Sequence, residues 1–465
     1  MTTPTWTPDG WHSLKPKQQP TWPDAVHLHD VLKDLRTRPP LIYAGEARIL
    51  KAQLARAATG QAFVLQAGDC AETFEGFSAD RVRDGLKTIL EAAVVLTYSS
   101  GVPVVKIGRV AGQYAKPRSA DKETAEGIEL PSYRGDMVNR PHFSAAARQP
   151  NPDNIITAYE QAAITLNLLR GFTAGGFADL ASAHKWNMEF VATSPEGERY
   201  EALANSIDTA LRFMKAIDVD GPSLHKVDFY TSHEALILDY EEALTRQDST
   251  ANDAWYDCSA HLLWIGTRTK DLGGAHVEFL RGVGNPLACK VDERTELDHV
   301  LGLCEALNPE REPGRLTLVS RMGADHVLES LPPMISAVRD AGHPVLWMCD
   351  PMHGNTITSE GGLKTRRFDD VFLEVSRYFD VHRELGTWPG GLHLELTGDN
   401  VTECLGGSDD LGHDDLHEHY NTACDPRLNA RQSLDLAFRV GELLLEFPNP
   451  SHTAAAAGSS SWDVI

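Results

Sequence analysis

The sequence predicts an α/β protein built as a (β/α)8 TIM barrel with an N-terminal extension and inserted helices. Short apolar runs alternate with amphipathic helical patterns along most of the chain, and this alternation is typical of parallel strands joined by right-handed crossovers. About eight such runs occur, the number that closes a barrel. An open doubly wound sheet is the alternative, but no Gly-x-Gly-x-x-Gly turn follows the first run.

Residues 1–60 are predicted to form the N-terminal extension, an extended arm followed by a helix. The arm contains Pro-rich and Trp-containing pieces such as "PKQQPTWPD", and the helix is expected near Glu46–Ala58. At the other end, residues 448–465 are rich in Ala, Gly and Ser and are expected to be a disordered tail.

The barrel is expected over residues 61–447, with a helical insertion at about 120–222 between the second and third strands. Helices are expected at Ala79–Tyr98, Arg294–Ala306 and Ala324–Ala341, and in "RQSLDLAFRVGELLLEF" after the last strand. The predicted strands are Ala62–Asp69, Pro103–Val110, Leu224–Ser232, His261–Gly266, Pro286–Val291, Arg315–Ser320, Pro344–Asp350 and Gly391–Thr397.

Composition excludes several classes of function. The 465 residues carry a formal net charge of −23, which argues against a general nucleic-acid-binding surface. No apolar run is long enough to span a membrane and no secretory signal is visible, so we expect a cytoplasmic protein. The seven cysteines form no paired spacing, so each is expected to be a free thiol or a ligand.

Chemically active side chains follow the predicted strands, at the barrel end where active sites lie. One set offers thiolate, imidazole and carboxylate ligands, a mixture that suits Mn, Fe, Co or Zn better than Mg or Ca. A second set offers cations for phosphate and carboxylate groups. The first set is Cys70, His353, Glu395 and Asp425; the second is Arg109, Arg268, Lys290 and Arg321. Each residue alone has an ordinary structural explanation, such as a buried thiol or a surface Arg, so only the joint pattern favours a site.

Eight motifs together resemble the class II 3-deoxy-D-arabino-heptulosonate 7-phosphate (DAHP) synthases, which open the shikimate pathway. The motifs are "QAGDCAE", "RVAGQYAKPRS", "LPSYRGDMVN", "SHEALILDYE", "LWIGTRT", "DPMHGNT", "LTGDNVTECLGG" and "ACDPRLN". The resemblance runs from about Trp11 to Phe447 and implies a (β/α)8 barrel, in agreement with the strand pattern.

The resemblance also implies roles for the strand-end residues. The first set would bind the catalytic divalent metal, with Mn²⁺ expected first and Co²⁺, Fe²⁺ or Zn²⁺ as alternatives. The second set would hold phosphoenolpyruvate, while Lys116 and Ser119 would face the phosphate of erythrose 4-phosphate. Lys290 and Arg268 are expected to be catalytic, and one hypothesis makes Lys290 the proton donor to the nascent alkoxide.

The chain departs from the family pattern on the phosphoenolpyruvate side. The family usually has "WIGERT", whereas this chain has "WIGTRT", with Thr267 in place of Glu, and "CKVDERT" replaces a Gly-rich "GPST"-like segment. An altered aldehyde substrate in a secondary-metabolite pathway, such as an amino or imino tetrose phosphate, is one interpretation, and a weakly active regulatory paralogue is another. The resemblance further implies a homo-oligomer, a dimer or larger, and a possible chorismate mutase partner.

Overall fold

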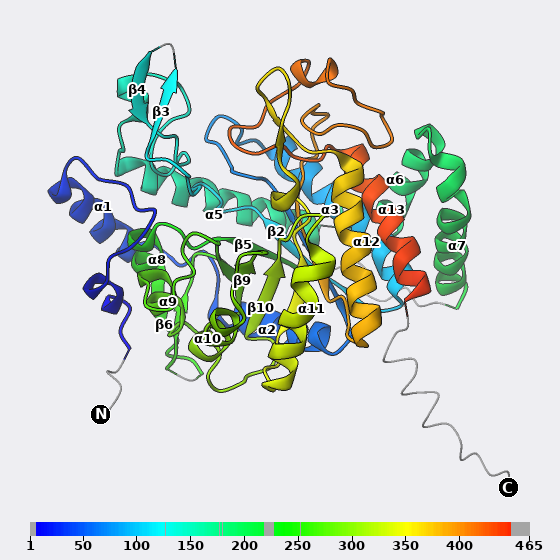
Figure 1. The fold of residues 1–465 in the computed structure, drawn as a ribbon, viewed down its shortest axis with the longest axis horizontal. Coiled ribbons are helices and arrows are strands. Elements are labelled where there is room, and N and C mark those ends of the chain that lie inside the picture. The colour runs from blue at the N-terminus through cyan, green and yellow to red at the C-terminus, as the bar shows by residue number, and fades with distance from the viewer. Residues whose placement is uncertain are drawn as a thin grey trace, which may run out of the picture.

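Eight parallel strands close into a barrel in the computed structural model, which describes residues 6–125, 127–175, 177–178, 180–217, 227–251 and 253–447 (Figure 1). Around the barrel the order is β1-β14-β11-β10-β9-β8-β5-β2. The strands are β1 (Phe63–Gly68), β2 (Val104–Arg109), β5 (Phe229–Glu234), β8 (Leu262–Ile265), β9 (Leu287–Val291), β10 (Leu316–Ser320), β11 (Leu346–Cys349) and β14 (Gly391–Glu395). The barrel prediction is therefore confirmed, although residues 224–226 of the third predicted run lie outside the described residues.

Register places the first site residues level with one another. Gly68, at the end of β1, pairs with Arg109 at the end of β2 on one side and with Glu395 at the end of β14 on the other. Because parallel strands in register end at the same rim, Cys70, two residues beyond Gly68, lies beside both side chains.

Helices cover the outside of the barrel between successive strands. The predicted helices appear as α3 (Ala79–Ser100), α10 (Leu297–Leu307), α11 (Val327–Asp340) and α13 (Ala430–Glu446). Three further helices complete the outer layer: α8 (Leu238–Leu244), α9 (Ala275–Leu280) and α12 (Phe368–Leu385). Figure 1 shows α11, α12 and α13 side by side on one face.

The N-terminal extension forms α1 (Ala25–Thr37) and α2 (Ala44–Ala58). The predicted helix corresponds to α2, whereas α1 lies in the stretch expected to be an extended arm. Leu50, Leu54 and Ala57 of α2 pack into the same cluster as Val64 and Met348. This apolar face covers the amino end of the barrel, opposite the rim that carries the site residues.

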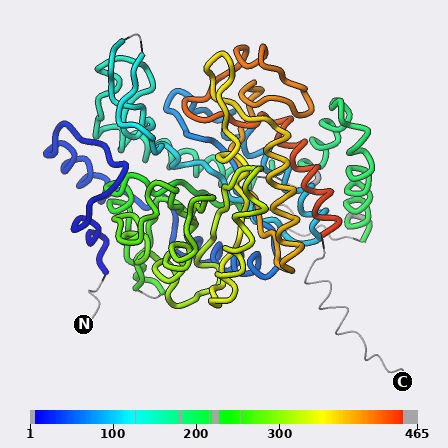
Figure 2. Tube along the Cα trace, in the orientation of Figure 1, coloured from blue at the N-terminus to red at the C-terminus, as the bar shows by residue number. Residues whose placement is uncertain are grey.

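The segment between β2 and β5 contains an exposed hairpin and several helices. The hairpin consists of β3 (Lys122–Ala125) and β4 (Ile128–Pro131), and the helices are α4 (Ala145–Arg148), α5 (Asp153–Ala174), α6 (Leu180–Thr193) and α7 (Gly197–Ala216). In Figure 2, α6 and α7 lie beside α13, far from the hairpin. Within the described parts of the chain, no helix is long and apolar enough to cross a membrane.

Polar side chains fill the barrel interior just below the site. His393 Nδ1 donates to Gln66 Oε1 at 2.8 Å, and Gln66 Nε2 donates to Ser232 Oγ at 2.9 Å. His393 Nε2 is then left to accept from Arg109, whose guanidinium also lies over the Trp264 ring. These hydrogen bonds give each buried polar group a partner and hold the Arg109 guanidinium in position.

We expect Gly135→Ala to destabilise the protein and Gly127→Ala to do so much less. Gly135 has a φ of +97°, and an added Cβ would come within 2.7 Å of Ala115 Cα and closer still to the Tyr114 carbonyl oxygen. Gly127 also has a positive φ, +76°, but its Cβ would meet nothing within 4 Å. Gly127→Ala, the control, should lower the free energy of unfolding by about 1 kcal/mol, and Gly135→Ala should lower it by about 3 kcal/mol more. Denaturant unfolding measures both, and equal losses would contradict the close packing.

Candidate active site

The carboxyl ends of the strands surround a cavity of about 300 Å³. Most predicted site residues line it, and the wall carries both signs of charge. Its lining includes Lys116, Arg118, Ser119, Glu234, Thr267, Arg268, Lys290, Arg321, His353, Lys364 and Asp425. The side chains come from segments far apart in the sequence, so the fold brings them together.

Three of the four predicted metal ligands form one cluster. One ligand atom from each of Cys70, Glu395 and Asp425 lies within 4.8 Å of the others. The Asp425 backbone N–H also donates to Cys70 Sγ at 3.2 Å, which ties the loop after β14 to the loop after β1. The cluster is buried, apart from partial exposure of Asp425.

His353 lies at the edge of this cluster. Its Nε2 is 3.1 Å from Glu395 Oε1, and its Nδ1 is 2.8 Å from Asp350 Oδ2. Asp350 also accepts from the His353 backbone N–H at 3.2 Å. Burial lowers the pKa of His353, and its Nε2 faces Glu395. A carboxylate holding the second ring nitrogen is the usual support for a metal-binding histidine.

The Lys116 ammonium occupies the centre of the acidic cluster. Its Nζ lies 3.0 Å from Cys70 Sγ, 3.1 Å from Glu395 Oε1 and 3.2 Å from Asp425 Oδ2. Although burial disfavours a charged amine, Cys70, Glu395 and Asp425 raise the pKa of Lys116 well above its usual value. A cation is therefore already stabilised at the point where these ligands converge.

The residues present fit a divalent first-row metal. A thiolate, an imidazole and two carboxylates provide a mixed sulfur, nitrogen and oxygen shell, which hard cations such as Ca²⁺ and Mg²⁺ do not prefer. The Lys116 ammonium marks a position where positive charge is favourable. His353, with Nε2 directed at Glu395, is placed to complete the set.

Glu395 is fully buried and is surrounded by cations. Arg366 donates to its Oε2 at 2.9 Å, and Arg109 donates to its Oε1 at 2.8 Å. Burial alone would favour the neutral acid, but His353, Lys116, Arg366 and Arg109 hold the pKa of Glu395 well below its usual value. Arg109 was predicted to bind substrate, but it is fully buried beneath the cavity and its guanidinium already has protein partners.

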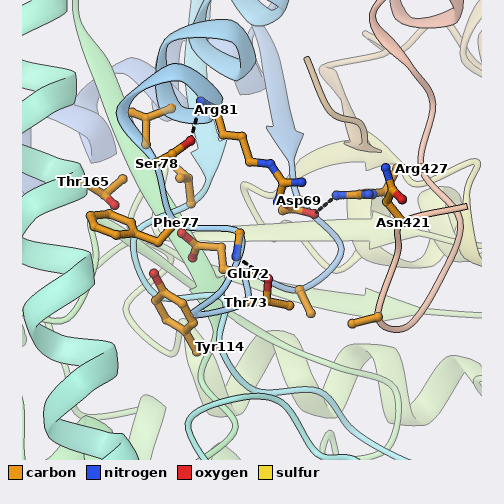
Figure 3. Close-up of a pocket in the computed structure, with 15 residues that line it drawn as sticks. Asp69, Glu72, Thr73, Phe77, Ser78, Arg81, Tyr114, Thr165, Asn421 and Arg427 are labelled. Atoms are coloured by element: carbon orange, nitrogen blue, oxygen red, sulfur yellow. Dashed lines mark hydrogen bonds and ion pairs between the residues drawn. The ribbon is translucent and has the colours of Figure 1, made fainter. Parts of the chain in front are cut away.

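A brace behind the cluster holds the two loops that carry Cys70 and Asp425. Arg427 donates to Asp69 Oδ1 at 2.8 Å, and Figure 3 shows these two side chains pointing toward each other beside a small cavity of about 80 Å³. Arg427 Nη2 also donates to Glu403 Oε1 at 2.7 Å. The ion pair links Asp69, which precedes Cys70, to Arg427, which lies two residues after Asp425.

The other predicted cations form a wall of the cavity. Lys290 Nζ donates to Asp350 at 2.7 Å, and burial lowers the pKa of Lys290 to about 8. Arg321 donates to the Thr267 hydroxyl at 3.3 Å, and its Nε has no hydrogen-bond partner among the described residues. Arg268 is exposed and donates to Ser119 Oγ at 3.0 Å.

Several cavity residues had no predicted role, and three of them are charged groups close to the predicted site residues. Glu234 ends β5 and is buried, with one carboxylate oxygen lacking a partner among the described residues. Burial raises the pKa of Glu234. Arg118 and Lys364 also line the cavity, and Lys364 donates to Asp425 Oδ1 at 2.9 Å. The sequence signal for Glu234 was its position at a strand end, next to His233.

The family model described as "Class-II DAHP synthetase family" matches residues 6–441. A relative named phospho-2-dehydro-3-deoxyheptonate aldolase, from Streptomyces coelicolor, is 53% identical over 433 residues, which cover 93% of this chain and 96% of that protein. A second, named phospho-2-dehydro-3-deoxyheptonate aldolase AroG, from Mycolicibacterium smegmatis, is 50% identical over 433 residues and covers 92% of each chain.

We expect Asp350→Asn to weaken Mn²⁺ binding by about 10- to 100-fold, the usual effect of losing the carboxylate behind a metal-binding histidine. The substitution keeps the shape but removes the charge that holds His353 Nδ1 and Lys290. Titration calorimetry measures the affinity, and circular dichroism checks that the variant is folded. Asp340→Asn, at an exposed position at the end of α11, is the control and should leave affinity unchanged. Equal affinities for both variants would show that Asp350 does not orient a ligand.

Proposed function

The chain belongs to the class-II DAHP synthetase family, and from this membership we propose that it condenses phosphoenolpyruvate, erythrose 4-phosphate and water into DAHP and phosphate. The enol carbon of phosphoenolpyruvate bonds to the aldehyde carbon, water adds at C2, and phosphate leaves. This aldol-type transfer is the first step of aromatic biosynthesis.

One observation about the active-site cavity supports the proposed reaction. The cluster of Cys70, Glu395 and Asp425 adjoins a cavity of about 300 Å³ through Asp425, which lines that cavity together with a wall of basic side chains. Both substrates are anions and one is an aldehyde, so the reaction needs both features: cations to offset repulsion and a centre that stabilises negative charge on oxygen.

We assign Arg268, Lys290 and Arg321 to phosphoenolpyruvate. Each lines the cavity, and the unpartnered Nε of Arg321 is an available donor for an oxyanion. Arg109 belongs to the same proposal, acting from beneath the cavity through its contact with Glu395. Ser119 and Lys116 are assigned to the erythrose 4-phosphate side, with Arg118 as an additional cation there.

Cys70, His353, Glu395 and Asp425 are the residues that would hold the divalent ion. When bound, the ion supplies Lewis acidity toward a substrate carbonyl oxygen. Mn²⁺ is the proposed ion, with Co²⁺, Fe²⁺ and Zn²⁺ compatible with the same donors. Asp350, Arg366 and Arg109 orient these ligands without being part of the shell.

We propose chemical roles for two further groups, Lys290 and Glu234. Lys290, held by Asp350, is the proposed donor to the alkoxide that forms when the aldehyde is attacked. Glu234 reaches the same cavity with a free carboxylate oxygen and is the proposed group for positioning the water that adds at C2. With Thr267 replacing the usual Glu, Glu234 is the acidic side chain left beside Gly266.

A second candidate function rests on Thr267. Its hydroxyl gives Arg321 one acceptor at 3.3 Å where the family pattern has a carboxylate. Such a change fits an enzyme of the same fold that takes a different phosphorylated aldehyde, for example an amino or imino tetrose phosphate. A weakly active regulatory paralogue would also tolerate the change.

A cytoplasmic location and self-assembly complete the proposal. All seven cysteines are free thiols, as expected in a reducing compartment. From the family resemblance we also propose a homo-oligomer, a dimer or larger, and a possible chorismate mutase partner.

We expect chelator-treated protein to release phosphate from phosphoenolpyruvate and erythrose 4-phosphate only after Mn²⁺ is added. Cys70→Ser should lower this release by at least about 100-fold because a hard hydroxyl replaces the thiolate ligand. A phosphate-release assay measures the rate, and mass spectrometry identifies the product. Cys304→Ser, a buried thiol remote from the cavity, is the matched control. Folded, metal-binding protein that releases no phosphate would favour the second candidate.

We expect Thr267→Glu to raise turnover with erythrose 4-phosphate severalfold while leaving the preference between aldehydes unchanged. The added carboxylate would balance Arg268 and help to position a water. Steady-state rates with erythrose 4-phosphate and with a second phosphorylated aldehyde measure both quantities. A shift in preference without a gain in turnover would instead identify Thr267 as a residue that selects the aldehyde.

A further inference from the structure

We propose that Lys116 is a built-in competitor for the metal: its ammonium neutralises the ligand cluster in the metal-free protein, and a divalent ion binds by displacing it into the substrate cavity. The inference rests on the metal site of the proposed function and adds to it a role for Lys116 that precedes substrate binding.

The contacts of Lys116 support this role. Besides Cys70 Sγ, Glu395 Oε1 and Asp425 Oδ2, at 3.0, 3.1 and 3.2 Å, Nζ contacts only the Cys70 carbonyl oxygen, at 3.3 Å, among the described hydrogen bonds and ion pairs. The side chain is 9% exposed. The whole hydrogen-bonding capacity of the ammonium is therefore directed at the ligand cluster, and none of it at a substrate position.

Other cations near the cluster do not share this position. Arg366 contacts Oε2 of Glu395, and Lys364 contacts Oδ1 of Asp425. Arg109 does reach Glu395 Oε1, but its guanidinium is also tied to the Asp69 carbonyl oxygen and to His393. Only Lys116 contacts all three members of the cluster among the described ion pairs and hydrogen bonds.

The ammonium and a divalent ion exclude each other. Cysteine, histidine and carboxylate ligands lie about 2.0 to 2.3 Å from such an ion. An ion bound by these atoms would lie close to Nζ, which is only 3.0 to 3.2 Å from the same atoms. Two positive charges at such separation repel strongly in a buried site, so the ammonium leaves when the ion binds.

The backbone around Lys116 confines the movement to the side chain. The Lys116 backbone N–H donates to the Arg134 carbonyl oxygen at 2.9 Å. Gly135, which follows Arg134, packs closely on Tyr114 and Ala115. Lys116 already lines the cavity, so a displaced ammonium remains there, facing the anionic substrates. Metal binding thereby creates a free cation for the substrate, and this couples the two binding events.

The test compares Mn²⁺ affinity in metal-free wild-type protein, Lys116→Met and Lys364→Met by titration calorimetry. We expect Lys116→Met to bind Mn²⁺ about tenfold tighter, which corresponds to about 1.4 kcal/mol. Lys364→Met also removes a cation from Asp425, but Lys364 contacts Oδ1, whereas Lys116 contacts Oδ2. This variant should therefore tighten Mn²⁺ binding much less. Unchanged or weaker affinity in Lys116→Met, or equal tightening in both variants, would overturn the inference.

A second measurement uses the wild-type chain and does not depend on a variant folding. Acylation of lysines, mapped by mass spectrometry with and without Mn²⁺, should show low reactivity of Lys116 without the ion and a severalfold increase with it. Lys364, whose side chain is 48% exposed, should react in both states. No change at Lys116 in protein that binds Mn²⁺ would contradict displacement.

The metal site itself is checked separately with Cd²⁺. A thiolate-to-metal absorption band that is lost in Cys70→Ser would place the ion at the cluster. Absence of the band in the wild type would overturn both the inference and the metal site of the proposed function. Its presence, with Lys116 reactivity unchanged, would overturn the inference alone.

Discussion

The organisation of the active end depends on one buried carboxylate, that of Glu395. Its two oxygens contact Arg109, Lys116, His353 and Arg366, which come from β2, the loop after it, the loop after β11 and the segment before α12. A buried charge without partners would be very costly. The strand register that sets Gly68 between Arg109 and Glu395 is what makes this compensation possible. The strand pairing that closes the barrel therefore also brings Glu395 together with the cations that neutralise it.

The two ends of the barrel meet different physical demands. At the amino end, Leu50 and Leu54 of α2 close the barrel with apolar contacts that carry no chemistry. Toward the carboxyl end, polar groups replace apolar ones: Gln66 and His393 form a hydrogen-bonded layer below Arg109. Apolar burial at the amino end stabilises the barrel, so the carboxyl end can hold buried charged groups that serve binding.

The sequence predicted the strands because their apolar runs are short and separated by helical periodicity, and it placed candidate ligands such as Cys70 where those runs end. It missed α1, although Asp24 caps that helix and a proline pair follows it, because the flanking prolines suggested an extended arm. It also missed Arg366 and Arg427, because nothing local marks a buried arginine whose partner lies tens of residues away. Long side chains such as Lys116 take their direction from tertiary neighbours, so a motif identifies the residue but not what its ammonium contacts.

The proposed displacement of Lys116 would change the charge of the cavity when a metal binds. In the structure, the Lys116 ammonium contacts Cys70, Glu395 and Asp425. A divalent ion adds two charges at the cluster and returns one more to the cavity wall, in a chain whose net charge is −23. Under this proposal, the loaded state offsets the repulsion between two anionic substrates better than the metal-free state does. The proposed displacement would therefore link the two events, since metal binding would strengthen the binding of the substrates that follow.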